Sequence, residues 1–259
     1  MHAMEIRVIA KRKYPELKKL YESFDVSSKA EICLAVGGDG TFIKAAKVHD
    51  GPILPISGMD PMSVSYYSDL SVNDIDFIIE SLKGRRYRVE SISRKLEIVY
   101  NKRKYYAVNE ALLHNIRESI RFTIYLVERG QRYKIYPYVI VGDGIIISNL
   151  VGSTAYNRVA GGPILLNKDD ISITFVNTDG PYRNPIVMDG DAKIEIDLLR
   201  YTGMLRYDGI DIGMLRPGGK FTVSLSNKSI DIIKFPNRYE KFDDKLEKIV
   251  KSRLVKELG

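Results

Sequence analysis

The stretch ICLAVGGDGTF, residues 32–42, decides the fold of this chain. Its first five residues, Ile32–Val36, form a continuous apolar run that is typical of a strand buried on both faces of a parallel sheet. The chain then passes through Gly37-Gly38-Asp39-Gly40-Thr41 into a helical pattern at residues 42–48. Glycines after a buried strand allow the backbone to turn sharply and bring its N–H groups close to an anion. We therefore predict a strand, an anion-binding loop and a helix in succession.

Strand and helix patterns alternate through the first ninety residues. Short apolar runs at residues 4–10 and 52–56 predict further strands, and residues 14–24 and 72–82 carry apolar side chains at helical spacing. This alternation predicts an α/β domain over residues 1–90, built on a small doubly wound parallel sheet.

From about Tyr87 the chain changes to short alternating apolar runs separated by turn residues. This pattern predicts an all-β-rich, sandwich-like C-terminal domain over residues 91–240. Residues 152–162 are rich in small side chains and are expected to form a short helix inserted among the strands. Residues 241–259 are predicted to form a terminal amphipathic helix that packs back on the chain's own body.

The composition limits the classes of protein to which the chain can belong. It has 40 Lys and Arg against 33 Asp and Glu, a net charge of +7 that favours anionic partners such as nucleotides. The single cysteine, Cys33, excludes an intramolecular disulfide and a multi-cysteine zinc site. With only three histidines, we expect no metal centre built from protein side chains.

Membrane and nucleic-acid roles are not expected either. The apolar runs are far shorter than the roughly 20 residues that span a bilayer, and no secretory leader pattern is visible, so we expect a cytoplasmic protein. Basic tracts at residues 11–13 and 102–104 are not accompanied by a nucleic-acid recognition motif. The P-loop, dinucleotide-fingerprint and zincin motifs are also absent from the sequence.

Asp39 is the first candidate for a chemical role. A carboxylate is a poor ligand for phosphate, so its place in an anion-binding loop suggests that it accepts a proton from an attacking hydroxyl or contacts Mg²⁺. A tight Gly-Asp-Gly turn with Asp39 as a helix cap is the alternative that spacing alone leaves open.

Two further features follow along the chain. Asn109-Glu110 comes directly after the apolar run at residues 105–108, where an amide and a carboxylate are suited to hold two vicinal ribose hydroxyls. Asp143-Gly144 precedes Gly152-Ser153-Thr154-Ala155-Tyr156, whose small residues suit a ligand lying against backbone and whose tyrosine offers a flat face or a hydroxyl. An ordinary surface turn and a sharp corner in a β fold are the respective alternatives.

In this order and at these separations, the three features together with Gly161-Gly162-Pro163 resemble the NAD kinase family, in the form of a divergent member of archaeal type. The resemblance covers about residues 32–242. The loop at residues 37–41 is not specific by itself, because diacylglycerol-type lipid kinases share it and phosphofructokinases carry a similar run. The segment at residues 152–156 combined with Asn109-Glu110 is far more discriminating.

The resemblance implies an N-terminal α/β domain, a β-rich second domain and a C-terminal helix that returns to the N-terminal domain. It also implies transfer of a phosphoryl group from ATP, with Mg²⁺, to the 2′-hydroxyl of the adenosine ribose of NAD. The resemblance further implies a homodimer or homotetramer, because the sites of this family are shared between subunits.

The resemblance assigns roles residue by residue. Asp39 matches the catalytic aspartate that takes the proton of the 2′-hydroxyl, Asn109 and Glu110 match a pair that binds a ribose of NAD, and Asp143 matches an aspartate that reaches NAD across a subunit interface. Tyr66-Tyr67 resembles an aromatic loop of the family. NAD-binding roles are implied for Asp39, Gly40, Asn109, Glu110, Asp143, Thr154, Ala155, Tyr156, Asn157, Arg158 and Val159, and ATP-phosphate contacts for Gly37, Gly38, Thr41 and Lys44.

The chain departs from the family pattern at Ser57, Val141, Asn184 and Ile210, which concerns peripheral contacts. Two other functions are compatible with parts of the pattern. A lipid kinase would use the same glycine loop and would leave Asn109-Glu110 without a purpose. A non-catalytic NAD-binding sensor would bind NAD and consume no ATP. The choice between ATP and polyphosphate, and between NAD and NADH, is not decided by these residues.

Overall fold

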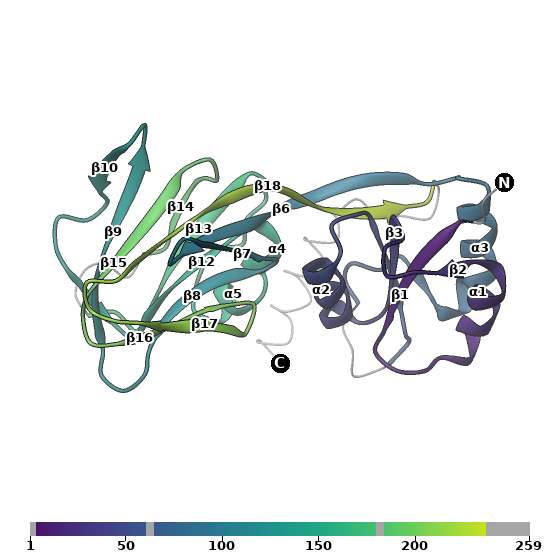
Figure 1. The fold of residues 1–259 in the computed structure, drawn as a ribbon, viewed down its shortest axis with the longest axis horizontal. Coiled ribbons are helices and arrows are strands. Elements are labelled where there is room, and N and C mark those ends of the chain that lie inside the picture. The colour runs from purple at the N-terminus through teal and green to yellow at the C-terminus, as the bar shows by residue number, and fades with distance from the viewer. Residues whose placement is uncertain (1–3, 61–64, 180–183, 237–259) are drawn as a thin grey trace, which may run out of the picture. The chain divides into compact units, whose positions relative to one another are not determined.

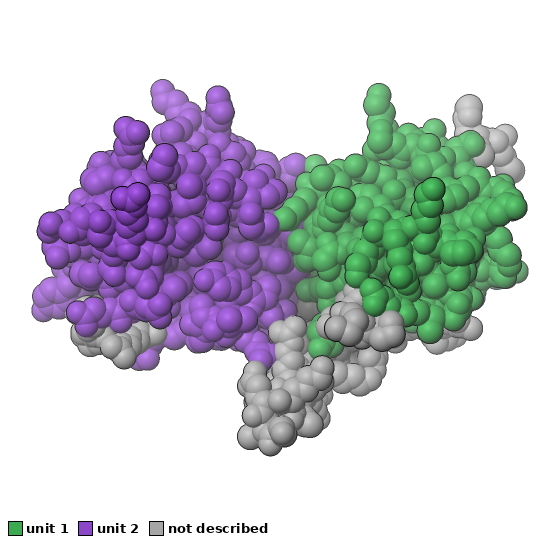
Figure 2. Space-filling view, turned by 90° about the horizontal axis from the view of Figure 1, so that it is seen from below, with its two compact units in different colours: residues 1–92, 230–259 green, residues 93–229 purple. Residues whose placement is uncertain are grey.

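The computed structural model describes residues 4–60, 65–179 and 184–236. The chain divides into two compact units, shown in green and purple in Figure 2. Unit 1 consists of residues 1–92 and 230–259, and unit 2 of residues 93–229. The chain re-enters unit 1 at residue 230, inside a strand, rather than at the expected residue 240. The predicted C-terminal helix at residues 241–259 lies outside the described residues.

Unit 1 is built on a parallel sheet in the order β2-β1-β3-β4. Strand β5 and the end of β18 also pair in parallel with β4. The bounds are Glu5–Ala10 for β1, Asp25–Val26 for β2, Ile32–Gly37 for β3, Ile53–Ser57 for β4 and Leu70–Ser71 for β5. The helices are α1 (Lys18–Ser23), α2 (Asp39–Val48) and α3 (Ile75–Lys83), with 3₁₀ turns at Pro15–Leu17 and Val72–Asp74.

Helices cover both faces of this sheet, with α2 on one side and α1 and α3 on the other (Figure 1). Side chains alternate across a strand, so β3 serves both faces. Ile32, Leu34 and Val36 join the buried cluster that contains residues of α1 and α3. On α2, the buried side chains include Phe42, Ala45 and Ala46. The α/β character predicted for this part of the chain is confirmed.

Unit 2 is rich in β-strands, as predicted. One antiparallel sheet has the order β14-β13-β12-β8-β16-β17. Its bounds are Glu110–Asn115 for β8, Gly144–Ser148 for β12, Asp170–Val176 for β13, Ile186–Asp189 for β14, Gly203–Tyr207 for β16 and Ile210–Leu215 for β17. The other strands are β6 (Arg88–Tyr100), β7 (Arg103–Ala107), β9 (Ile120–Glu128), β10 (Gln131–Lys134), β11 (Ile140–Gly142), β15 (Lys193–Arg200) and β18 (Lys220–Lys234).

One hydrophobic core joins these strands. Phe122 of β9 and Phe221 of β18 pack in the same buried cluster as Ile147 of β12 and Ile173 of β13. Since β9 and β18 belong to one sheet and β12 and β13 to the other, the two sheets share their buried faces.

Several elements differ from the sequence prediction for identifiable reasons. Near the C-terminal end of the β-rich part, the predicted short runs give way to one long strand, β18 (Lys220–Lys234). Ser226 lies inside it, where it is buried and its Oγ accepts the Lys228 N–H (3.1 Å). The helix expected at residues 152–162 is two single turns, α4 (Leu150–Ser153) and α5 (Tyr156–Val159). In the described part of the chain, no helix combines the length and apolar character needed to cross a membrane.

Candidate active site

The glycine loop of unit 1 is shaped by Gly37, the last residue of β3. Its φ of 152° lies in a region that side chains rarely adopt, and a Cβ there would lie 2.4 Å from Thr41 Oγ1. The Gly37 carbonyl accepts hydrogen bonds from the Gly58 N–H (3.3 Å) and Ser65 Oγ (3.3 Å). Gly37 therefore shapes the loop from within, and the residues after it form the surface that a ligand can reach.

Helix α2 begins at Asp39, three residues earlier than predicted, with Gly38 as its N-cap. Asp39 thus lies in the first helical turn and does not cap the helix, which removes the capping alternative. Asp39 is partly buried, and its Oδ1 accepts the Tyr67 N–H at 3.4 Å. The Tyr67 ring stacks on Phe42 of α2, with ring centroids 4.4 Å apart. The predicted aromatic loop therefore orients the predicted catalytic carboxylate.

A pocket of about 320 Å³ lies against this loop, lined by Ala10, Lys11, Gly38, Gly40, Thr41 and Lys44. The structure therefore brings together Gly38, Thr41 and Lys44, which were predicted to contact phosphate, with Gly40, which was predicted to contact NAD. Two lysines and the N-terminus of a ten-residue helix give the pocket the charge that an anion requires.

Lys11 was not predicted as a site residue, because it belongs to a basic tract of a kind that is usually solvated. Its backbone N–H donates to the Val36 carbonyl (2.9 Å), which places it beside the glycine loop, and its Nζ pairs with Asp60 (2.9 Å). The available signal was topological: Lys11 follows β1, and the carboxyl ends of neighbouring parallel strands meet at one edge of a sheet.

A buried ion pair anchors the loop that carries Tyr67. Lys234, at the end of β18, is 2% exposed, and its Nζ lies 2.6 Å from Asp69 Oδ2. Nothing in the local sequence around residue 234 indicates this role, because the two partners are 165 residues apart.

In unit 2, Asn109 and Glu110 are not in an exposed surface turn. Asn109 lies between β7 and β8, and Glu110 is the first residue of β8. We call residues 108–110 the β7–β8 turn, in which Glu110 is only 8% exposed. The Asn109 Oδ1 atom is buried and has no hydrogen-bond partner among the described residues. A buried acceptor without a partner is costly, and a ligand donor such as a ribose hydroxyl would satisfy it.

The small-residue segment packs directly on this turn. Asn149 is fully buried, and its Nδ2 donates to the Val108 carbonyl (3.0 Å) while its Oδ1 accepts the Gly152 N–H (2.9 Å). A Cβ on Gly152 would lie 1.9 Å from the Asn109 carbonyl oxygen, so only glycine fits there. Two features that are 40 residues apart in the sequence are therefore in contact.

Residues 154–159, which follow this segment, divide into exposed and buried side chains. Tyr156 is 43% exposed and Val159 is 81% exposed, so both side chains are open to a ligand, as Thr154, Ala155 and Arg158 are in part. Asn157 is fully buried: its Nδ2 donates to the Pro163 carbonyl (2.9 Å), and its Oδ1 accepts from Thr174 Oγ1 (2.7 Å) and Ser172 Oγ (3.2 Å). The polar atoms of the Asn157 side chain therefore hold this turn.

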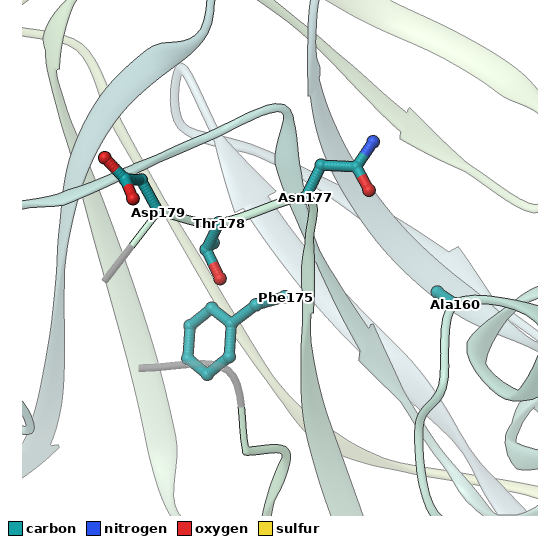
Figure 3. Close-up of a pocket in the computed structure, with 5 residues that line it drawn as sticks. All are labelled: Ala160, Phe175, Asn177, Thr178 and Asp179. Atoms are coloured by element: carbon teal, nitrogen blue, oxygen red, sulfur yellow. The ribbon is translucent and has the colours of Figure 1, made fainter. Parts of the chain in front are cut away.

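Asp143 lies between β11 and β12, and its carboxylate accepts hydrogen bonds from Asn115 Nδ2 (2.9 Å), Ser119 Oγ (3.0 Å) and Asn177 Nδ2 (3.0 Å). Asn177 also lines an open pocket of about 560 Å³ with Ala160, Phe175, Thr178 and Asp179. Figure 3 shows Asn177 and Asp179 projecting to opposite sides, with the Phe175 ring below Thr178. Asp143 is thus fixed by side chains of its own chain, one of which, Asn177, lines this pocket.

Metal and thiol chemistry find no further support in the described residues. These ranges contain no cluster of three or more His, Cys, Asp or Glu side chains that would hold a metal ion. Burial raises the pKa of the Cys33 thiol to about 11, so the thiol stays neutral near pH 7. This agrees with its place in the core of unit 1.

Comparison with known proteins gives consistent results. Residues 131–235 match the family model described as the ATP-NAD kinase C-terminal domain. An NAD kinase of Sulfurimonas denitrificans is 26% identical over 228 residues, which cover 86% of this chain and 78% of the relative. An NAD kinase of Thermoplasma acidophilum is 28% identical over 240 residues, which cover 88% of this chain and 84% of the relative.

The chain is similar to NAD kinases over most of its length.

Two solved structures have the same fold as this chain. A yeast NADH kinase complexed with NADH has a TM-score of 0.77 at 16% identity, covering 95% of this chain and 88% of the other. An NAD kinase from Archaeoglobus fulgidus in complex with ATP has a TM-score of 0.72 at 19% identity, covering 95% of this chain and 98% of the other. The chain therefore shares the fold of these two structures, with an α/β N-terminal part and a β-rich C-terminal part.

The four departures from the NAD kinase pattern lie at separate places in the fold. Ser57 ends β4, and its Oγ accepts the Met59 N–H (3.3 Å). Val141 lies in β11, while Asn184 is exposed and Ile210 is 44% exposed at the start of β17. Nothing in the structure explains these substitutions.

Proposed function

We propose that the chain is an NAD kinase that transfers the γ-phosphoryl group of ATP to the 2′-hydroxyl of the adenosine ribose of NAD, giving NADP and ADP. The observation that carries this proposal is the structure of the glycine loop. Asp39, whose orientation the Tyr67 backbone supports, lies in the same first helical turn as Gly40 and Thr41, which line a two-lysine pocket. A proton acceptor beside an anion pocket is what phosphoryl transfer to an alcohol requires.

Each unit contributes a separate part of the chemistry. Unit 1 binds the phosphates of ATP with the backbone N–H groups at residues 38–41 and the charges of Lys11 and Lys44. Unit 2 binds NAD with Asn109, Glu110 and the segment at residues 154–156, with contributions from Arg158, Val159 and the Asp143 region. Phosphoryl transfer has a loose transition state that is stabilised mainly by positioning and charge, and these groups are of the kind that supply both.

The bond changes follow directly. The ribose 2′-oxygen forms a bond to the γ-phosphorus, the bond from that phosphorus to the bridging oxygen breaks, and ADP leaves with the electron pair. The proton of the hydroxyl passes to Asp39. Mg²⁺ bound to ATP would neutralise charge on the phosphates. Mg²⁺ at such sites is held by phosphates, water and one or two carboxylates, and the phosphates of ATP with the Asp39 carboxylate fit this arrangement.

The proposal includes the cellular compartment and the oligomeric state of the protein. We place it in the cytoplasm, as a homodimer or homotetramer without nucleic-acid or membrane partners. Light scattering of the purified full chain gives its mass in solution, and a monomer that is fully active would contradict the oligomeric part of the proposal alone.

The direct test is incubation of the full chain with ATP, Mg²⁺ and NAD, with NADP measured by a specific dehydrogenase. Parallel reactions with polyphosphate and with NADH define the donor and acceptor. NADP formation is the expected result. NAD binding without NADP formation would indicate a sensor, and phosphorylation of diacylglycerol in vesicles would indicate a lipid kinase; either result without NADP would overturn the proposal.

The role of Asp39 is tested by Asp39→Asn. General-base assistance is worth roughly 10²–10⁴-fold, so we expect kcat to fall by about that factor while NAD binding, measured by calorimetry, is retained. The matched control is Asp76→Asn, an exposed carboxylate of unit 1 that pairs with Lys19, which should leave kcat unchanged. An unimpaired turnover of Asp39→Asn would rule out proton transfer to this carboxylate.

A further inference from the structure

The hairpin between β16 and β17 turns at Asp208-Gly209. Both residues have positive φ angles, 46° for Asp208 and 78° for Gly209. Tyr207 and Ile210 pair across them, so this is a two-residue hairpin loop of the kind that favours Asn-Gly, Asp-Gly or Gly-Gly. The backbone conformation alone would therefore accept asparagine or glycine at position 208 as well as aspartate.

The side chain of Asp208 also accepts hydrogen bonds from outside the hairpin. Its Oδ2 accepts the Val108 N–H (2.8 Å), and its Oδ1 accepts the N–H groups of Asn109 (2.7 Å) and Glu110 (3.2 Å). Its own backbone N–H donates to the Glu110 carbonyl (3.1 Å). Three consecutive amide donors are thus satisfied by one carboxylate 98–100 residues away in the sequence.

An asparagine would satisfy these donors poorly. Its side chain has one acceptor oxygen, and its NH₂ group would face a backbone N–H, so one amide of the β7–β8 turn would lose its partner. Hydrogen bonds to a charged acceptor are also shorter and stronger than neutral ones. The need for aspartate at position 208 comes from the β7–β8 turn and not from the hairpin.

The same turn is held from its carbonyl side by the segment at residues 149–152. Asn149 Nδ2 donates to the Val108 carbonyl, and Gly152 packs against the Asn109 carbonyl. With its amides bound by Asp208 and its carbonyls covered, the backbone of the turn is fixed. The buried Asn109 Oδ1, which lacks a partner in the described chain, then has one orientation in which to meet a ligand.

We propose that Asp208 is a positioning residue for NAD: its carboxylate fixes the β7–β8 turn so that Asn109 and Glu110 are already oriented for the ribose hydroxyls. This inference rests on the proposed function. Asp208 acts through the backbone of other residues, so its loss should weaken NAD binding and leave ATP binding, which uses the pocket of unit 1, unchanged.

The test compares the full-length wild type with Asp208→Asn and Asp208→Gly, both of which retain a residue that adopts positive φ. The matched control is Asp211→Asn, which removes a carboxylate from the same hairpin that pairs with Arg206 and has a side chain 49% exposed. The measurements are KM for NAD, KM for ATP, kcat, Tm and hydrogen exchange of the peptide covering residues 105–112.

For both Asp208 variants we expect KM for NAD to rise about tenfold to hundredfold, the range for loss of one or two charge-assisted hydrogen bonds, with KM for ATP within about twofold of the wild type. The 105–112 peptide should exchange faster, and Asp211→Asn should match the wild type throughout. An unchanged KM for NAD would overturn the inference, as would an equal rise in both KM values with a collapsed Tm, which would indicate general destabilisation. If the wild type forms no NADP, the proposed function is wrong. In that case, unaltered hydrogen exchange of the 105–112 peptide in the Asp208 variants would still refute the role of Asp208.

Discussion

Replacing Gly152 with alanine is the sharpest perturbation of the proposed NAD site. The added Cβ would lie 1.9 Å from the Asn109 carbonyl oxygen, 2.4 Å from its carbon and 2.7 Å from its Cα, and all three are backbone atoms. Real Cβ contacts essentially never fall below 3.0 Å, so the two segments must separate by a further 1.1 Å. No rotation of a side chain can relieve this overlap.

The displacement acts on the residues that are proposed to bind ribose. Overpacking of a well-packed region costs about 1–3 kcal/mol, and a backbone clash belongs at the upper end of that range. For a chain of this size, about 2–3 kcal/mol corresponds to a Tm lowered by about 4–12 °C. A misplacement of about 1 Å in a substrate-positioning group can cost as much as 10²-fold in rate, so we also expect kcat/KM for NAD to fall by one to two orders of magnitude.

The assay is differential scanning calorimetry together with steady-state kinetics in NAD and in ATP. Leu166→Ala, a change at a 74% exposed residue near the same segment, is the control and should alter neither Tm nor kinetics. KM for ATP should stay constant in Gly152→Ala. A variant with the Tm and the KM for NAD of the wild type would show that the small-residue segment does not support the β7–β8 turn.

Further outcomes are expected for Lys11 and for Cys33. Lys11→Ala should raise KM for ATP about twofold to fivefold, the value of one exposed ion pair with a phosphate, and leave KM for NAD unchanged. Lys13→Ala, from the same basic tract but outside the pocket lining, should have no effect. Because burial raises the pKa of Cys33 to about 11, native protein at pH 8 should resist thiol reagents, and the thiol should react in denaturant. The folded chain binds more protons than the unfolded chain between pH 9 and about 11, so its stability should fall across that interval. Fast labelling of native protein at pH 8 would contradict this burial.

The parallel sheet of unit 1 was predictable because its signals are local. A five-residue apolar strand followed by a glycine loop fixes the order of strand, turn and helix, and the structure follows it at β3 and α2. The start of α2 was placed three residues late, because Asp39 and Gly40 read as turn residues although they form the first helical turn. Local propensity in this loop is overridden by the packing of Phe42 and Thr41.

The sequence left two interpretations of Asn109-Glu110 open, a pair that holds ribose hydroxyls and an ordinary surface turn. In the structure Glu110 begins β8 and pairs with Ser148, which is buried in β12. Carboxylates are rarely buried, so Glu110 departs from the apolar pattern of a central strand. The position that breaks the strand pattern is thus one of those that the resemblance assigns to NAD.

What the sequence could not provide is the set of contacts that hold the candidate residues in place. Asp208 lies about 100 residues from the turn that it fixes, and Lys234 lies 165 residues from Asp69. Neither role can be recognised from the local sequence. Asp208-Gly209 is already explained as a hairpin turn, and Lys234 looks like an ordinary charged residue at the end of a strand. The side chains that are proposed to touch substrate follow from residue type and loop chemistry. Those that are proposed to position them follow only from topology, because the pairing of β16 with β8 brings the Asp208 carboxylate to the amides of residues 108–110.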